Sequence, residues 1–135
     1  MALMEKQIIV FTLGEKYYAV DSGQVEEISK MIDSTLVPNA PKHIKGLINL
    51  RGNVVALVDL SKLLQRQEEE CYNNIVIMNK EDEKIGILVT EVKEVLKIQE
   101  EDIEKVSKET KGGVVGIIQL GENLVNYIDL ARIIS

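Results

Sequence analysis

The feature that most constrains the fold of this chain is an internal repeat. Residues 46–64 (GLINLRGNVVALVDLSKLL) align without a gap on residues 116–134 (GIIQLGENLVNYIDLARII), at an offset of 70. Seven of the nineteen aligned positions are identical, and five of the other twelve exchange one aliphatic residue for another. Self-similarity at a fixed offset is typical of a duplicated structural unit. The sequence therefore predicts a protein built from two similar halves.

The similarity extends upstream with a small shift. IIVFTLGEKYYAV and QVEEISK lie over IVIMNKEDEKIGILV and EVKEVLK, so the repeats span approximately residues 8–64 and 75–134. Each half reads as a strand, a hairpin turn, a strand, a short amphipathic piece, two more strands and a closing helical turn. Each repeat therefore corresponds roughly to one small barrel, and we allow for strand exchange between the two barrels.

The core of this chain has to be aliphatic. Hydrophobic residues make up 45% of the 135 residues, but there is one Phe and no Trp. Ile and Val suit pleated strands, and a chain of this length buries about two thirds of its unfolded surface on folding. We therefore expect a single domain over residues 1–135, in the all-β class with short helices.

Turn residues mark the hairpins of both halves. Gly14-Glu15 separates two apolar strands and places Gly at the first central position of a two-residue type II′ turn. Arg51-Gly52 lies at the corresponding place between the later strands, and its counterpart in the second repeat is Gly121-Glu122. The pattern predicts that Arg51 lies at a hairpin tip.

Two aspartates and two polar stretches complete the assignment. Asp59 and Asp129 follow strands and precede LSKLL and LARII, so each is expected to cap a helical turn by accepting hydrogen bonds from free backbone amides. Residues 65–70 and 99–113 have no periodicity strong enough for burial, and we interpret both as loops or linkers.

The residue inventory argues against catalysis and against metal or cofactor binding. His43 is the only histidine and Cys71 the only cysteine, and they share no local motif; a pair formed by folding stays open. No spacing typical of a metal site is present, and no glycine-rich loop precedes a Lys-Ser or Lys-Thr pair. The sequence therefore predicts no enzyme, no metal and no cofactor.

Charge and targeting signals favour protein partners in the cytoplasm. The net charge is −6, which disfavours nucleic acid; a small barrel that binds single strands remains the alternative. The N-terminal MALMEKQ has no basic region before its apolar stretch, and no apolar run approaches the ~20 residues that span a bilayer. We expect a cytoplasmic protein that does not insert into membranes.

Several segments together resemble the CheW family of bacterial chemotaxis adaptors. FTLGEKYYAV, QVEEI, the NLRG tetrapeptide, VDL, IGILV, EVKEVL and a terminal IDL occur in that family's order and cover nearly the whole chain. The resemblance implies two pseudo-symmetric five-stranded SH3-like barrels around a shared hydrophobic core. It also implies a non-enzymatic scaffold that couples the cytoplasmic tip of methyl-accepting chemotaxis receptors to the regulatory domain of the histidine kinase CheA, in a flagellar or another signalling pathway. The protein would then be recruited to receptor arrays at the inner face of the membrane.

The resemblance also implies three groups of site residues. The receptor-binding groove between the barrels is assigned Val25, Glu27, Ile28, Gly86, Val92 and Val95. Coupling of receptor and kinase is assigned Arg51 and Gly52. The kinase-binding surface is assigned Gly46, Ile75 and Val76.

The residues alone favour a structural role for most of these positions. Val25 and Ile28, like Val92 and Val95 in the second repeat, show the i, i+3 spacing of a helix, and apolar residues so placed usually belong to a core. The glycines suit turns, bulges or close strand approaches. Arg51 differs, because a hairpin tip has no structural need for arginine and Gly121 occupies the equivalent tip. We therefore expect a functional role for Arg51.

Overall fold

Two β-sheets with short helical turns make up the structure. The computed structural model of the chain describes residues 4–64, 71–106 and 113–134. Sheet A has the strand order β8-β1-β2-β11-β10-β9, with β1 Glu5–Leu13, β2 Lys16–Asp21, β8 Glu91–Gln99, β9 Ile103–Lys105, β10 Val114–Leu120 and β11 Asn123–Ile128. Sheet B has the order β3-β6-β7-β5-β4, with β3 Glu27–Lys30, β4 Ile44–Leu50, β5 Asn53–Asp59, β6 Asn74–Lys80 and β7 Glu83–Val89. The helical turns are η1 Ser22–Gln24, α1 Leu60–Leu63, η2 Glu100–Asp102 and α2 Leu130–Ile134.

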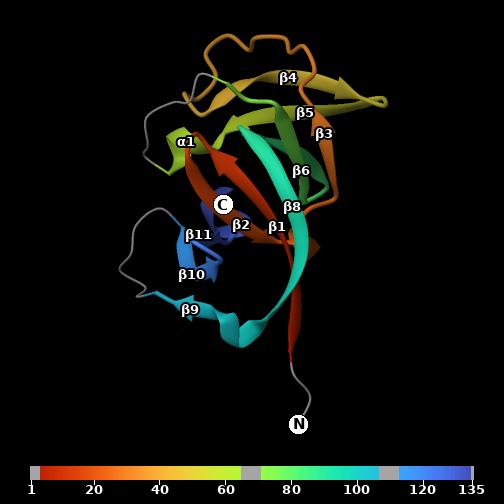
Figure 1. The fold of residues 1–135 in the computed structure, drawn as a ribbon. Coiled ribbons are helices and arrows are strands. Elements are labelled where there is room, and N and C mark those ends of the chain that lie inside the picture. Colours follow the sequence, from red (N-terminus) through yellow and green to blue (C-terminus); the bar gives the residue numbers. More distant parts are fainter. Residues whose placement is uncertain (1–3, 65–70, 107–112, 135) are drawn as a thin grey trace.

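Each sheet takes strands from both repeats. Sheet A combines β1 and β2 of the first repeat with β8 to β11 of the second, and sheet B combines β3, β4 and β5 with β6 and β7. The two repeats pair with each other at four places: in parallel, β2 with β11 and β5 with β7, and antiparallel, β1 with β8 and β3 with β6. Sheet B fills one end of the molecule and β9 to β11 the other, with the long β1 and β8 running between them (Figure 1).

The register of the strands repeats with the same offsets as the sequence. Ile9 pairs with Val95 across β1 and β8, and the equivalent Val76 pairs with Ile28 across β6 and β3. The hairpins β4–β5 and β10–β11 each contain a bulge at the same place, next to Gly46 in the first and Gly116 in the second. The structure is therefore pseudo-symmetric, and β3 of sheet B corresponds to β8 of sheet A.

One hydrophobic cluster joins the two sheets. It contains buried side chains of β1, β2 and β11 from sheet A and of β5, β6 and β7 from sheet B, together with Leu60 and Leu130 of the helical turns. Two smaller clusters lie within the individual sheets. The all-β class and the shared core expected from the sequence are confirmed.

The predicted turns and caps have the expected geometry. Gly14 has a φ of 62°, as the first central position of its turn requires. Asp59 accepts a hydrogen bond from the backbone amide of Ser61 at 3.0 Å, and Asp129 accepts one from Ala131 at 3.1 Å. Both aspartates therefore cap the helical turns that follow them.

Sheet A has one strand more than the five that were expected. β9 lies in the stretch 99–113, for which the sequence predicts a loop or linker, and it pairs with Gly116, Ile117 and Ile118 of β10. A strand of three residues is too short to show an alternating pattern. The counterpart in sheet B is a single bridge between Thr35 and Leu47.

We expect that neither repeat folds alone, because each sheet lacks strands when one repeat is missing. Residues 1–68 and 69–135, expressed separately, should show no cooperative thermal transition by circular dichroism. Mixing the two fragments should restore a single transition. A cooperative transition in either fragment alone would contradict the account.

Candidate functional site

Four aliphatic residues assigned to the predicted groove lie on or directly before the edge strands β3 and β8. Ile28 lies on β3 opposite Val76, and Val95 lies on β8 opposite Ile9. Directly opposed residues of an antiparallel pair point to the same face, and both opposed partners belong to the shared core. We call Val25, Ile28, Val92 and Val95 the edge-strand patch.

The patch contains two kinds of residue. Ile28 is 39% exposed and Val95 is 49% exposed. Val25 and Val92 are half-buried and pack against the shared core. The patch therefore has an inner pair that stabilises the fold and an outer pair that is available to a partner.

The inner pair is held in place by two polar side chains that the sequence analysis missed. The amide group of Gln24 donates to Asp129 at 2.8 Å and its oxygen accepts from the backbone of Leu130, which fixes η1 against α2 next to Val25. The oxygen of Asn74 accepts from the backbone amide of Val92 at 2.9 Å, and its nitrogen donates to the carbonyl of Ser29. Asn74 thereby links β8 to β3. These contacts join residues that are far apart in the sequence, so they become visible only once the two repeats are packed together.

The i, i+3 spacing of the patch residues is not helical. β3 and β8 are strands, and the valine before β3 follows a single 3-10 turn. The expected burial is wrong for the outer pair, because β3 and β8 are edge strands and leave these residues without a covering neighbour on one side. In a regular strand, residues three apart point to opposite faces, but the bulge in the pairing of β8 with β1 adds one residue and brings Val92 and Val95 to the same face.

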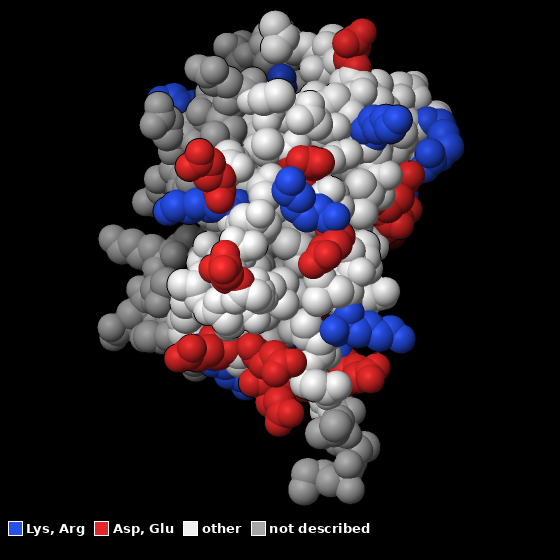
Figure 2. All heavy atoms as spheres, in the orientation of Figure 1, with Lys and Arg blue, Asp and Glu red and all other residues white. Residues whose placement is uncertain are grey.

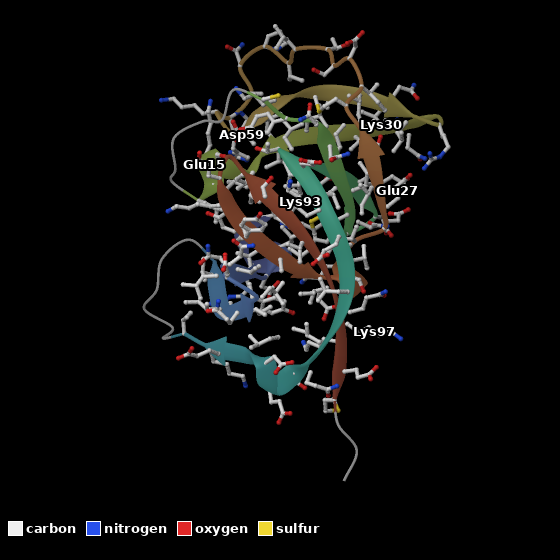
Figure 3. The ribbon with its side chains drawn as sticks, in the orientation of Figure 1. Glu15, Glu27, Lys30, Asp59, Lys93 and Lys97 are labelled. Atoms are coloured by element: carbon white, nitrogen blue, oxygen red, sulfur yellow. The ribbon has the colours of Figure 1, made fainter. Side chains whose placement is uncertain are left out.

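Arg51 and Glu27, which were predicted to belong to the site, form an ion pair. Arg51 lies at the tip between β4 and β5, and its guanidinium donates to the Glu27 carboxylate on β3. This hydrogen bond raises the pKa of Arg51 above its ordinary value. The pair links the two edge strands of sheet B, since β3 and β4 are at opposite ends of the strand order. Glu27 is the first residue of β3 (Figure 3).

The backbone at Arg51 is unfavourable for an arginine. Its φ is 50°, and that of Gly52 is 86°. Positive φ at both central residues is typical of a type I′ turn, which favours Asn-Gly. The equivalent Gly121 has a φ of 58°. The side chain of Arg51 is 68% exposed, so neither the turn nor the core explains an arginine at this position.

The remaining predicted residues lie elsewhere. Gly86 is buried on β7, where an added Cβ would lie 2.7 Å from a methyl carbon of Ile75. Gly46 is buried on β4, where an added Cβ would lie 2.8 Å from the carbonyl oxygen of Thr35. Ile75 and Val76 are 0% and 1% exposed. Packing accounts for these four positions, and their side chains do not line the surface.

The structure shows no arrangement typical of a catalytic centre in the residues it describes. His43 lines a pocket of about 370 Å³ and Cys71 is exposed beside Asn73. Within the described ranges, no group of three His, Cys, Asp or Glu residues could hold a metal ion. No helix in the described part of the chain is long and apolar enough to cross a membrane. Acidic and basic side chains are interspersed on the face that carries β8, without a basic stripe (Figure 2).

An exposed aliphatic patch beside a charged hairpin tip is suited to binding another protein. The CheW-like domain family matches residues 7–135. The chain is 33% identical over 136 residues to the chemotaxis protein CheW of Bacillus subtilis (strain 168), which covers 96% of this chain and 87% of that protein. It is 30% identical over 137 residues to the chemotaxis protein CheW of Thermotoga maritima, covering 99% and 91%.

A solved structure agrees with these relatives. The crystal structure of the scaffolding protein TtCheW from Thermoanaerobacter tengcongensis superposes with a TM-score of 0.87 at 31% identity, covering 99% of this chain and 90% of that chain. The protein is a scaffold or adaptor of bacterial chemotaxis and not an enzyme. The chain belongs to the CheW family.

Because Val92 packs against the core and Val95 is exposed, the same substitution at these two positions of β8 should lower the free energy of unfolding by different amounts. Val92→Asp should lower the free energy of unfolding by about 2 kcal/mol, because it places a carboxylate against the shared core. Val95→Asp should lower it by less than about 1 kcal/mol, because this side chain is exposed. Urea unfolding of both variants measures the difference, and equal losses would refute the division.

Proposed function

We propose that this protein couples methyl-accepting chemotaxis receptors to the regulatory domain of the histidine kinase CheA. The observation that supports this function best is the exposed arginine of the β4–β5 hairpin, next to an exposed aliphatic patch on a scaffold without a catalytic centre. The names of the relatives support the chemotaxis setting. The assignment of the two partners rests on the family resemblance.

The edge-strand patch is the proposed receptor contact. Its outer residues, Ile28 and Val95, are related by the pseudo-symmetry of the two sheets and lie over the same core. An aliphatic surface of this kind suits the apolar face of an amphipathic helix. The cytoplasmic tip of a receptor would supply that helix.

Arg51 and Gly52 are the proposed coupling residues. A guanidinium has five donors, so Arg51 can keep its bond to Glu27 and still donate to a carboxylate or a carbonyl of a partner. Gly52 lies in open space, because an added Cβ would meet no atom within 4 Å. A partner's backbone can therefore approach the hairpin tip closely.

The kinase contact is proposed at the ends of the sheets, near Gly46 and the stretch that contains Ile75 and Val76. Because these residues are buried, exposed neighbours would make the contact while the three named residues maintain its shape. Binding to both partners would place the protein in receptor arrays at the inner face of the membrane.

The receptor contact is tested with Val95→Asp. The variant should bind a receptor signalling domain at least about tenfold more weakly, because the contact would bury an unpaired carboxylate. Leu124→Asp is the matched control, since Leu124 is 62% exposed on β11 and lies outside the patch. Isothermal titration calorimetry measures both affinities. Unchanged affinity of the folded Val95→Asp protein would reject the patch as the receptor contact.

The coupling role is tested with Arg51→Asn, which removes the guanidinium but keeps a residue that tolerates a positive φ. This variant should keep the melting temperature of the parent protein and should fail to activate the kinase in a reconstituted complex with receptors. Gly121→Asn places the same residue at the equivalent tip of sheet A and should activate normally. Full activation by Arg51→Asn would show that Arg51 is an ordinary turn residue.

A further inference from the structure

The two sheets differ at one pair of equivalent corners. In sheet B, two ion pairs join the beginning of the edge strand β3 to the rest of the sheet. Glu26 pairs with Lys84 of β7, and Glu27 pairs with Arg51 at the β4–β5 tip. Cationic side chains therefore balance both carboxylates of this corner.

The equivalent corner of sheet A has neither ion pair. The repeat offsets place Lys93 where sheet B has Glu26, and Tyr17 where it has Lys84. Glu94 is the counterpart of Glu27, but Gly121 stands in place of Arg51. Lys93 bonds to Glu91 on its own strand at 3.1 Å (Figure 3 shows Lys93 on β8). Among the residues that the structure describes, no side chain or backbone group forms a hydrogen bond or ion pair with the Glu94 carboxylate.

A pocket of about 490 Å³ lies at this corner of sheet A. It is lined by Val10, Tyr17, Lys93, Glu94, Leu120, Gly121, Asn123 and Val125. Val10 and Val125 are buried and Leu120 is half-buried, so the pocket has an apolar floor. Because Lys93 is balanced by Glu91, the unbalanced charge of the lining is the carboxylate of Glu94.

Three lining residues are identical to their counterparts in sheet B: Leu120, Asn123 and Val125 correspond to Leu50, Asn53 and Val55. The two corners thus share part of their walls and an acidic residue on the edge strand. They differ at the first position of the hairpin tip, which is Arg51 in sheet B and Gly121 in sheet A.

We propose that the pocket at Glu94 binds an arginine side chain presented by a loop of a different protein. The partner's guanidinium would donate to the Glu94 carboxylate, as Arg51 donates to Glu27. The aliphatic part of the side chain would cover the apolar floor, which suits arginine because its methylene groups pack on apolar surface while its head stays polar. Lysine would bind less well, because its ammonium is more strongly hydrated and lacks the planar fork.

The arginine is assigned to another protein rather than to a second copy of this chain. The hairpin arginine of this chain, Arg51, is already bonded to Glu27 within its own sheet. Arg51 can add a surface contact without losing Glu27, but laying its whole side chain along the floor of a second copy's pocket would carry the guanidinium away from Glu27 and break that ion pair. A different protein with a free arginine on a loop has no such cost.

The test uses the peptide acetyl-Gly-Arg-Gly-amide as the probe and the ¹⁵N-labelled full chain as the receptor. We expect saturable shifts of the backbone amides of Val10, Glu94 and Asn123, with a Kd on the order of 1 mM for a single side chain. Glu94→Gln should weaken binding about fivefold, as expected for loss of one charge-assisted hydrogen bond at a solvated site. Glu101→Gln, an exposed carboxylate outside the pocket, is the matched control and should bind like the parent protein.

Two further measurements test whether the pocket prefers a guanidinium and whether the bound group lies beside Glu94. The lysine peptide acetyl-Gly-Lys-Gly-amide should bind more weakly than the arginine peptide, and equal binding would overturn the preference for guanidinium. Gly121→Arg should place a guanidinium beside Glu94 within the chain and abolish saturable binding of the peptide. If this variant does not fold, Glu94→Gln decides the question.

Three results would overturn the proposal. One is the absence of saturable shifts at the pocket, and another is equal binding by the parent protein and Glu94→Gln. The third is a dimer in sedimentation equilibrium that Glu94→Gln abolishes, because it would assign the arginine to a second copy of this chain.

Discussion

Every other feature of this protein depends on one core that neither repeat can build alone. The shared cluster takes side chains from six strands, three in each sheet, and from both helical turns that close the repeats. Because β2 pairs with β11 and β1 with β8, while β5 pairs with β7 and β3 with β6, each sheet is completed by strands of the other repeat. The same pairings leave β3 and β8 at the edges, with their apolar residues over the shared core. The edge-strand patch is therefore a consequence of how the core is assembled.

The symmetry of this scaffold makes its asymmetries informative. Equivalent hairpins in the two sheets have the same bulge and the same positive φ at the tip, yet one tip is Arg51 and the other is Gly121. Since glycine satisfies the backbone at the second tip, the arginine at the first has to be explained by what it contacts. Within the chain it contacts Glu27, and most of its side chain remains exposed. The corner that lacks the arginine has a free carboxylate, Glu94, and a pocket.

Much of this architecture could be predicted from the sequence, because the repeat offsets give the strand equivalences directly. The positions of the Arg51 hairpin and of the Asp59 and Asp129 caps follow from local chemistry, which a sequence records. The contact between Arg51 and Glu27 could not be predicted from the residues, because it depends on how far sheet B curves. The same holds for Asn74, whose partners lie on two other strands. The i, i+3 spacing of the patch residues is misleading, because on β8 a bulge brings residues three apart to one face of a strand.

The central claim is that the two sheets share one core and unfold as one unit. Native-state hydrogen exchange in increasing denaturant tests it most directly, because it measures the opening free energy of each amide. The account predicts that the amides of Phe11 in sheet A and Val76 in sheet B converge on the same free energy at the same denaturant concentration. Two separate values, one for each sheet, would show that the sheets are independent units and would contradict the shared core as the basis of the fold.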